Sequence, residues 1–228
     1  FPAELFLTTN AHGEGSNPSA VLVPNGGSAT DNTGYSRLNH IPAPVNDFAF
    51  TQQNVPVSGN VLTNDYLGDT PISSLTIVTN GTHGVAVLNL DGSYTYTPNP
   101  GYYGVDLFVY QLCDKNSDCA QATVTITVNG TPAAVNDAIN TPANVPVLIN
   151  PLINDADPNG DPLIITFVNP TNGIASIVNN TNVLFTPAAN FSGTATIGYT
   201  ISDGNGGTAS ALITVTVSPS ADVALTKS

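Results

Sequence analysis

Basic residues are nearly absent from this chain. Its 228 residues hold 3 Lys and Arg against 16 Asp and Glu, for a formal net charge of -13. Three cations cannot follow a phosphate backbone, which excludes nucleic acid as a partner. An anionic membrane surface is disfavoured for the same reason. No apolar run approaches the ~20 residues of a membrane-spanning helix, so we expect no membrane span in this chain.

Strong helix formers are also scarce. Met and Trp are absent, and the only Glu residues are Glu4 and Glu14. Residues that favour strands and turns take their place, among them 20 Gly and 18 Pro. This composition excludes a helical bundle and disfavours an α/β enzyme.

Cysteine occurs only twice, at Cys113 and Cys119. The five residues between them are typical of a turn between two strands, so the two side chains would face each other across a hairpin and form a disulfide. Two unpaired thiols remain the alternative. Metal binding is disfavoured because no other Cys or His lies near enough to complete four ligands. A disulfide indicates an oxidising compartment and therefore secretion.

The chain contains an internal repeat. The segment Pro42-Ala-Pro-Val-Asn46-Asp47 recurs 90 residues later as Pro132-Ala-Ala-Val-Asn136-Asp137. The pair Asn64-Asp65 likewise recurs as Asn154-Asp155. We therefore divide the chain into an N-terminal extension, two copies of one module and a C-terminal tail, with the boundaries 1–41, 42–130, 131–218 and 219–228.

Each copy is predicted to consist of strands. Apolar residues alternate with polar ones over 120–128 in the first copy and over 209–217 in the second. A period of two residues is typical of a strand with one buried face. Short strands separated by clusters of Gly, Pro, Asn and Asp predict an antiparallel β-sandwich in each copy.

Four segments of the second copy carry a family resemblance. In order, these are Val135-Asn-Asp137, the Asp- and Asn-rich run over 152–163, Phe185-Thr-Pro-Ala-Ala-Asn-Phe-Ser-Gly193, and Tyr199-Thr-Ile-Ser-Asp-Gly-Asn-Gly-Gly-Thr-Ala209. Together they resemble the bacterial cadherin-like, immunoglobulin-like tandem repeats of large surface adhesins and secreted repeat proteins. The resemblance implies an all-β fold of two tandem Greek-key sandwiches. It also implies a calcium-stabilised stalk or adhesive module that is secreted or held at a bacterial cell surface.

The strongest candidate for chemistry is the loop that contains Asp155, Asp157, Asn159 and Asp161. Ca²⁺ binds six to eight oxygen atoms, and three carboxylates this close together would otherwise repel one another. The spacing matches the first half of an EF-hand loop, but Thr166 stands where the bidentate Glu would be. The alternative interpretation is that these residues only form Asx-turns.

The resemblance adds Asp137 and Asp203 to this set of candidate calcium ligands. In the first copy the Asp-Pro-Asn run is missing, and a weaker set of candidates remains: Asp47, Asp65, Asp69 and Asp114. A calcium site shared at the junction of the two copies is a further alternative. The cofactor we predict is therefore Ca²⁺.

No catalytic arrangement is apparent. His12, His40 and His83 are far apart in sequence and none has the spacing of a metal ligand. No nucleophile elbow is present, and the Asp residues fit turns better than a catalytic pair. We therefore predict that the chain is not an enzyme.

The segments outside the repeat suggest assembly. The N-terminal extension holds two candidate strands, Ala3–Thr9 and Ala20–Val23, which cannot bury a core alone. The tail, Ala221-Asp-Val-Ala-Leu-Thr-Lys-Ser228, resembles the opening strand of another bacterial surface repeat. One hypothesis is a fibre in which such a segment adds to a sheet edge of the next subunit. The other is that both segments are pieces of neighbouring domains.

The preferred function is thus an extracellular structural protein, either an adhesin stalk or a fibre subunit. Its partners would be other copies of itself or neighbouring domains of the same protein. The alternatives are a module that binds a glycan or a cell-surface protein, and an accessory domain of a secreted enzyme. An exposed aromatic patch would favour binding, and Tyr102, Tyr103 and Phe191 are the candidates for it.

Overall fold

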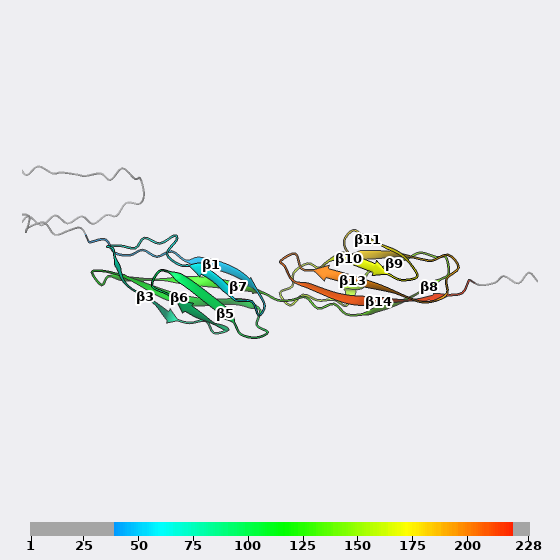
Figure 1. Ribbon diagram of the computed structural model, residues 1–228, viewed down its shortest axis with the longest axis horizontal. Helices are drawn as coiled ribbons and strands as arrows, with labels where there is room; N and C mark the ends of the chain where they lie inside the picture. The colour runs from blue at the N-terminus through cyan, green and yellow to red at the C-terminus, as the bar shows by residue number, and fades with distance from the viewer. Residues whose placement is uncertain (1–38, 221–228) are drawn as a thin grey trace, which may run out of the picture. The chain divides into compact units, whose positions relative to one another are not determined.

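The computed structural model describes residues 39–220, which form two β-sandwich modules (Figure 1). The candidate strands Ala3–Thr9 and Ala20–Val23 and the tail 221–228 lie outside the described residues. Within the described part, the only helical element in either module is the short 3-10 turn η2 (Pro151–Ile153), which is capped by Asn150. The predicted all-β class is confirmed.

The first module contains seven strands in two sheets. One sheet has the order β1-β7-β6-β3 and the other β2-β5-β4. The strand bounds are β1 (Asp47–Gln52), β2 (Val57–Asn60), β3 (Ile72–Thr79), β4 (Gly84–Leu88), β5 (Ser93–Pro98), β6 (Gly104–Asp114) and β7 (Cys119–Asn129).

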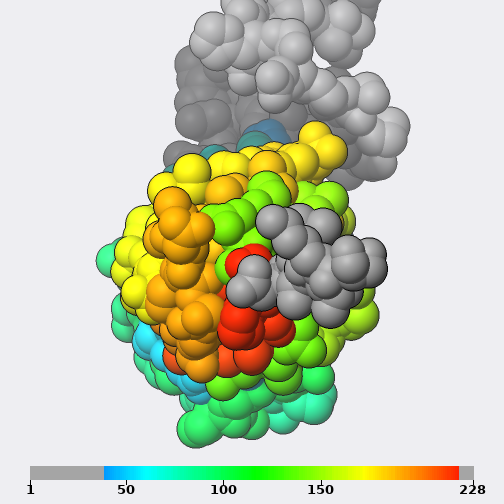
Figure 2. All heavy atoms as spheres, turned by 90° about the vertical axis from the view of Figure 1, so that its right-hand side faces the viewer, coloured from blue at the N-terminus to red at the C-terminus, as the bar shows by residue number. Residues whose placement is uncertain are grey.

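The second module repeats this arrangement. Its sheets have the orders β10-β13-β14-β8 and β11-β12-β9. Figure 2 shows the orange residues of β13 beside the red residues of β14 at one end of the module. The strand bounds are β8 (Asp137–Pro142), β9 (Val147–Ile149), β10 (Ile164–Pro170), β11 (Gly173–Val178), β12 (Asn182–Pro187), β13 (Gly193–Ser202) and β14 (Thr208–Ser218).

One pairing in each module differs from the antiparallel expectation. Strands β1 and β7 pair in parallel, as do β8 and β14, whereas all other neighbours are antiparallel. The parallel pairing follows from the number of strands in each module. Because the chain reverses direction at each connection, the first and the seventh strand point the same way.

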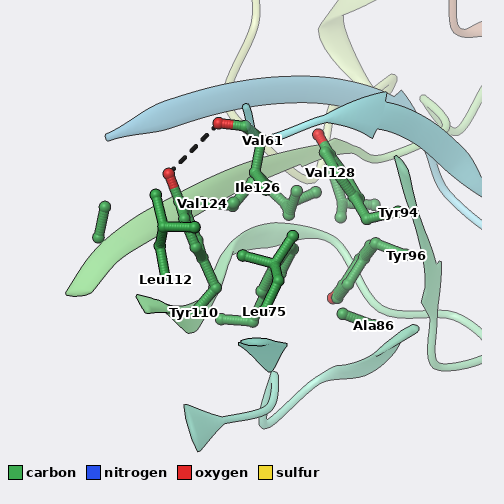
Figure 3. Close-up of a cluster of buried hydrophobic side chains, with 12 residues drawn as sticks. Val61, Leu75, Ala86, Tyr94, Tyr96, Tyr110, Leu112, Val124, Ile126 and Val128 are labelled. Atoms are coloured by element: carbon green, nitrogen blue, oxygen red, sulfur yellow. Dashed lines mark hydrogen bonds between the residues drawn. The ribbon is translucent and has the colours of Figure 1, made fainter. Parts of the chain in front are cut away.

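The alternating residues of the long strands build the core of each module. In the first module, Tyr96, Tyr110 and Ile126 lie in this core (Figure 3), and these three residues and Phe108 have no exposed surface. The second core is equivalent and contains Phe185, Ile197, Tyr199 and Ile213. Each fully buried side chain of this size contributes about 1.5–3 kcal/mol relative to an exposed one.

The predicted disulfide is confirmed. Cys113 and Cys119 lie directly opposite each other on β6 and β7, with their sulfur atoms 2.04 Å apart. In the second module, Ser202 and Thr208 take the same cross-strand position. The last hairpin of the module therefore adopts the same strand pairing with a disulfide, as in the first module, and without one, as in the second.

Replacing Cys113 with Ser and Cys119 with Thr should lower the free energy of unfolding of the first module by about 2 kcal/mol, because the disulfide closes only a short loop. Hydrogen exchange at buried amides, measured at increasing urea concentration, reports the free energy of unfolding of each module separately. The matched variant, Ser202→Cys with Thr208→Cys, should form a disulfide and stabilise the second module by a similar amount. An unchanged first module would contradict the prediction.

Candidate functional site

Each module holds two carboxylates near the hydroxyl of a buried Tyr. In the second module, the Tyr199 hydroxyl lies 3.1 Å from both carboxylate oxygens of Asp155 and 2.9 Å from the Val135 carbonyl oxygen. The Val135 N–H donates to Asp155 Oδ1 at 2.7 Å. Asp137, the first residue of β8, interacts electrostatically with both Tyr199 and Asp155. We call Asp137 and Asp155 the second carboxylate pair.

The first module has the same arrangement. The Tyr110 hydroxyl donates to Asp65, with 2.8 Å to Oδ2, and the Val45 N–H donates to Asp65 Oδ1 at 2.7 Å. Asp47 begins β1 beside this group, and we call Asp47 and Asp65 the first carboxylate pair. The structure thus unites residues that the sequence could only place in separate segments.

Burial makes Asp47, Asp65 and Asp137 reluctant to ionise, because it raises the pKa of each carboxyl. Desolvation, reinforced by the charge of Asp65, raises the pKa of Asp47 to about 6. Desolvation also raises the pKa of Asp65 and of Asp137. Burial and the neighbouring carboxylates raise the pKa of Tyr110 and Tyr199 as well, so both hydroxyls keep their protons and act as donors.

The loop of the second module forms an Asx-turn around Asp157. Asp157 Oδ1 accepts the N–H of Asn159 at 2.8 Å and that of Asp161 at 3.1 Å. Gly160 adopts a φ of +81°, which lets the chain close the turn. The turn uses only one of the two carboxylate oxygens of Asp157.

Three buried carboxylate oxygens in the described residues have no hydrogen-bond partner: Asp47 Oδ2, Asp137 Oδ2 and Asp157 Oδ2. An unpaired buried polar atom is costly, and such atoms are rare in folded proteins. All three belong to residues that the sequence selected as candidate calcium ligands.

The remaining candidate ligands of the second module make hydrogen bonds in the hairpin between β13 and β14 and at the junction, the segment that joins the two modules. Asp203 is 4% exposed, and its Oδ1 accepts the N–H groups of Asn205 and Gly207 at 2.8 and 2.9 Å. Asp161 Oδ2 accepts from the Asn205 amide at 2.9 Å, and Asn159 Oδ1 accepts the Gly130 N–H at 2.5 Å. These side chains therefore gather near the segment that joins the modules.

The first module has an equivalent group of carboxylates at its last hairpin, between β6 and β7. Asp114 is fully buried, and its Oδ1 accepts the N–H groups of Asn116 and Asp118 at 2.8 and 3.1 Å. Asp69 Oδ2 accepts from the Asn116 amide at 2.6 Å. The predicted ligands of each module thus form two groups, the carboxylate pair beside the buried Tyr and the carboxylates at the last hairpin.

Over residues 39–220, no three His, Cys, Asp or Glu side chains converge in a way that would hold a metal ion. Calcium binding therefore stays a prediction.

Two residues that no sequence motif had indicated, Asn129 and Gln52, complete the junction. Asn129, which is 2% exposed, donates to Asp203 Oδ2 at 2.7 Å and to Gln52 Oε1 at 3.0 Å. Gln52 in turn donates to the Asn205 carbonyl oxygen at 2.6 Å. Among the described residues, those from Ile41 onward fall in one compact unit that contains these bonds. Single Asn and Gln residues carry no motif that would have revealed them.

A buried carboxylate in the first module was also missed. Asp106 is 4% exposed and accepts from the Tyr96 hydroxyl at 2.7 Å and from the His83 N–H at 3.0 Å. Burial alone would raise its pKa, but these hydrogen bonds outweigh that effect and lower it. Ionised Asp106 therefore stabilises the module above its unfolded pKa. Ala195 and Phe185 replace this pair in the second module.

The fold and the repeated site define a tandem immunoglobulin-like β-sandwich. The family model described as bacterial Ig domain matches residues 39–127 and 129–216, so the chain belongs to that family. Domains of this kind are generally non-enzymatic and support an extracellular structural or adhesive role. A search of curated proteins finds no match.

Solved structures show similarity in fold alone. The human desmocollin-1 ectodomain aligns with a TM-score of 0.49 and 14% identity, over 80% of this chain and 43% of that one. An I-band fragment of titin, I67–I69, aligns with a TM-score of 0.46 and 13% identity, over 77% of this chain and 65% of that one. The chain thus spans less than two thirds of either structure. Among the described residues, we find no helix with the length and apolar character needed to cross a membrane.

In chelator, the melting temperature of the first module should fall as the pH rises from about 4 to about 6. Folded Asp47 has a pKa of about 6 against 3.8 in the unfolded chain, so the folded state binds the proton more tightly across this range. Asp47→Asn should flatten this slope, as measured by calorimetry at several pH values. Asp91→Asn, at an exposed hairpin carboxylate, should keep the slope. A wild-type profile that rises over this range would contradict the assignment.

Proposed function

We propose that this chain is a non-enzymatic, extracellular structural protein whose tandem sandwiches are stabilised by Ca²⁺. In this role it serves as the stalk of a bacterial surface adhesin or as the subunit of a surface fibre. The observation that carries the proposal is the set of three unpaired, buried carboxylate oxygens, on Asp47, Asp137 and Asp157. Family membership and the disulfide support the structural role and the oxidising location.

The donor set fits Ca²⁺ by its chemistry. Carboxylate and amide oxygens are the ligands that this hard cation prefers. In the second module, Asp157 and Asp161 would contribute to one ion together with the Asn159 amide oxygen, and Asp137 and Asp155 would contribute to another. Both oxygens of Asp203 already accept hydrogen bonds. The same groups recur in the first module around Asp47, Asp65, Asp69 and Asp114.

Calcium would also offset the repulsion within a chain of net charge -13. A cation that binds only the folded form raises the free energy of unfolding by mass action. Ions near Asp157 and Asp203 would stiffen the junction, where Asn129 and Gln52 already connect the two modules.

Replacing Asp157 and Asp161 with Asn should lower the melting temperature in millimolar calcium but leave it nearly unchanged in chelator. The design uses the geometry of the turn: the amide that replaces the Asp157 carboxylate would keep an oxygen that accepts the two loop N–H groups, and would lose the anionic second oxygen. Differential scanning calorimetry in calcium and in EGTA makes the measurement, with Asp91→Asn as the control. Equal losses in both buffers would show that these residues act on the turn alone.

Fibre and stalk make different assemblies. Electron microscopy of the chain in millimolar calcium should show regular filaments if it is a fibre subunit, and separate particles if it is a stalk segment. Deleting residues 1–10 should abolish filaments that form by strand addition through this segment. Filaments that persist would assign the donor role to the tail instead.

A second candidate function, glycan binding, is favoured by one groove. Phe167, Asn169, Gly198, Thr200, Ser210 and Leu212 line a shallow groove of about 330 Å³ on the outer face of the second module. Its walls are uncharged and combine a 57% exposed aromatic ring with hydroxyl and amide groups, which suits a neutral sugar. Calorimetric titration with neutral oligosaccharides tests this function. A Cβ at Gly198 meets no atom closer than 3.9 Å, so Gly198→Ala places a methyl group in the groove with little strain.

A further inference from the structure

The outer face of the first module's four-stranded sheet exposes apolar side chains on β1 and β6, the two strands that flank β7. Phe48 and Phe50 of β1 are 80% and 50% exposed, and Val105 and Leu107 of β6 are 62% and 44% exposed. The strand register places Thr125 of β7 between Phe48 and Leu107, and Thr127 between Phe50 and Val105. These six residues form two adjacent rows, and we call them the Phe48 face.

The second module provides an internal comparison. The register places Ala138, Thr214 and Thr196 in the row that matches Phe48, and Asn140, Thr216 and Thr194 in the row that matches Phe50. Both sheets have the same strand order and the same pairing, although one face is apolar and the other is mostly polar. The fold therefore does not require the apolar residues of the Phe48 face.

The Phe48 face is suited to contact with a second copy of the chain. None of its six residues is charged, so two strongly acidic chains can meet there without opposing carboxylates. A two-fold contact places the same patch of two identical chains against each other, so the uncharged rows of one Phe48 face would meet the uncharged rows of the other. Strand β1 is also an edge strand with a single neighbour, so both Phe side chains stand at the rim of the sheet.

The size of the face sets the strength of the contact. An aromatic side chain buries about 150–250 Å² when fully covered. With the exposed fractions of Phe48 and Phe50, the two rings offer on the order of 250 Å². A stable interface buries about 800 Å² per partner. The contact is therefore weak between two chains in solution and gains strength where many chains stand side by side.

We propose that the Phe48 face is a lateral self-association surface, through which first modules of neighbouring chains pair across the outer faces of their β1-β7-β6-β3 sheets. The pairing is distinct from head-to-tail assembly through the ends of the chain, and it requires no calcium. In a surface layer it would bundle stalks or fibres side by side.

Sedimentation equilibrium of the full chain in EDTA, from about 10 µM to about 1 mM, tests this proposal. The wild-type chain should shift toward dimer as its concentration rises. A variant that carries the residues of the second module (Phe48→Ala, Phe50→Asn, Val105→Thr and Leu107→Thr) should associate roughly tenfold more weakly, as expected when anchoring aromatic residues are lost. Its melting temperature serves as the check on folding.

The matched control removes exposed apolar residues from the opposite sheet. Val85 and Val87 of β4 are 56% and 60% exposed, and Val85→Thr with Val87→Thr should leave the dimerisation constant unchanged. An equal loss in this control would overturn the assignment to the Phe48 face. A wild-type chain that stays monomeric up to about 1 mM would overturn the proposal itself. Because the measurement is made in EDTA, its failure would leave the calcium proposal untouched.

Discussion

The hydrogen bond between a buried tyrosine and an aspartate is the interaction on which each module depends. Tyr110 and Tyr199 are at most 1% exposed, so their hydroxyls need partners inside the protein. Each finds one in Asp65 or Asp155, which fastens the long central strand to the loop that follows β2 or β9. The same bond draws this Asp toward the Asp that begins β1 or β8. The two carboxylates thus share a partly desolvated site, which raises the pKa of Asp47 and creates the need for a counter-charge.

The duplication shows which features the sandwich requires. Both modules keep the tyrosine–aspartate bond, the strand order and the Asp that caps the last hairpin. They differ where the first module has its disulfide, the buried Asp106–Tyr96 pair and the Phe48 face. Ser and Thr, Ala and Phe, and a largely Thr surface replace these features in the second module without changing the topology. The differences therefore mark properties that belong to one module rather than to the fold.

Electrostatics connects stability to assembly in this chain. Its 16 acids against 3 bases leave the carboxylates with few internal cations, so Asp side chains are satisfied by N–H groups and hydroxyls instead. Those donors do not reach Asp47 Oδ2, Asp137 Oδ2 and Asp157 Oδ2. A divalent cation would complete these positions. Contact between copies, by contrast, is easiest where charge is lacking, as on the Phe48 face.

The sequence alone determined the repeat, the β-sandwich class and the disulfide, because each leaves a local or periodic signal: matching motifs at a constant spacing, two-residue alternation, and two Cys flanking one turn. It also selected the carboxylates of interest. Only the tertiary structure decided how they group, since Asp47 meets Asp65, and Asp203 meets Asn129, through contacts between distant segments. The parallel pairing of β1 with β7 and the outward direction of Phe48 and Phe50 were hidden for a related reason. Over 48–50 every residue is apolar, so alternation could not tell that Ala49 faces the core and the two Phe residues face solvent.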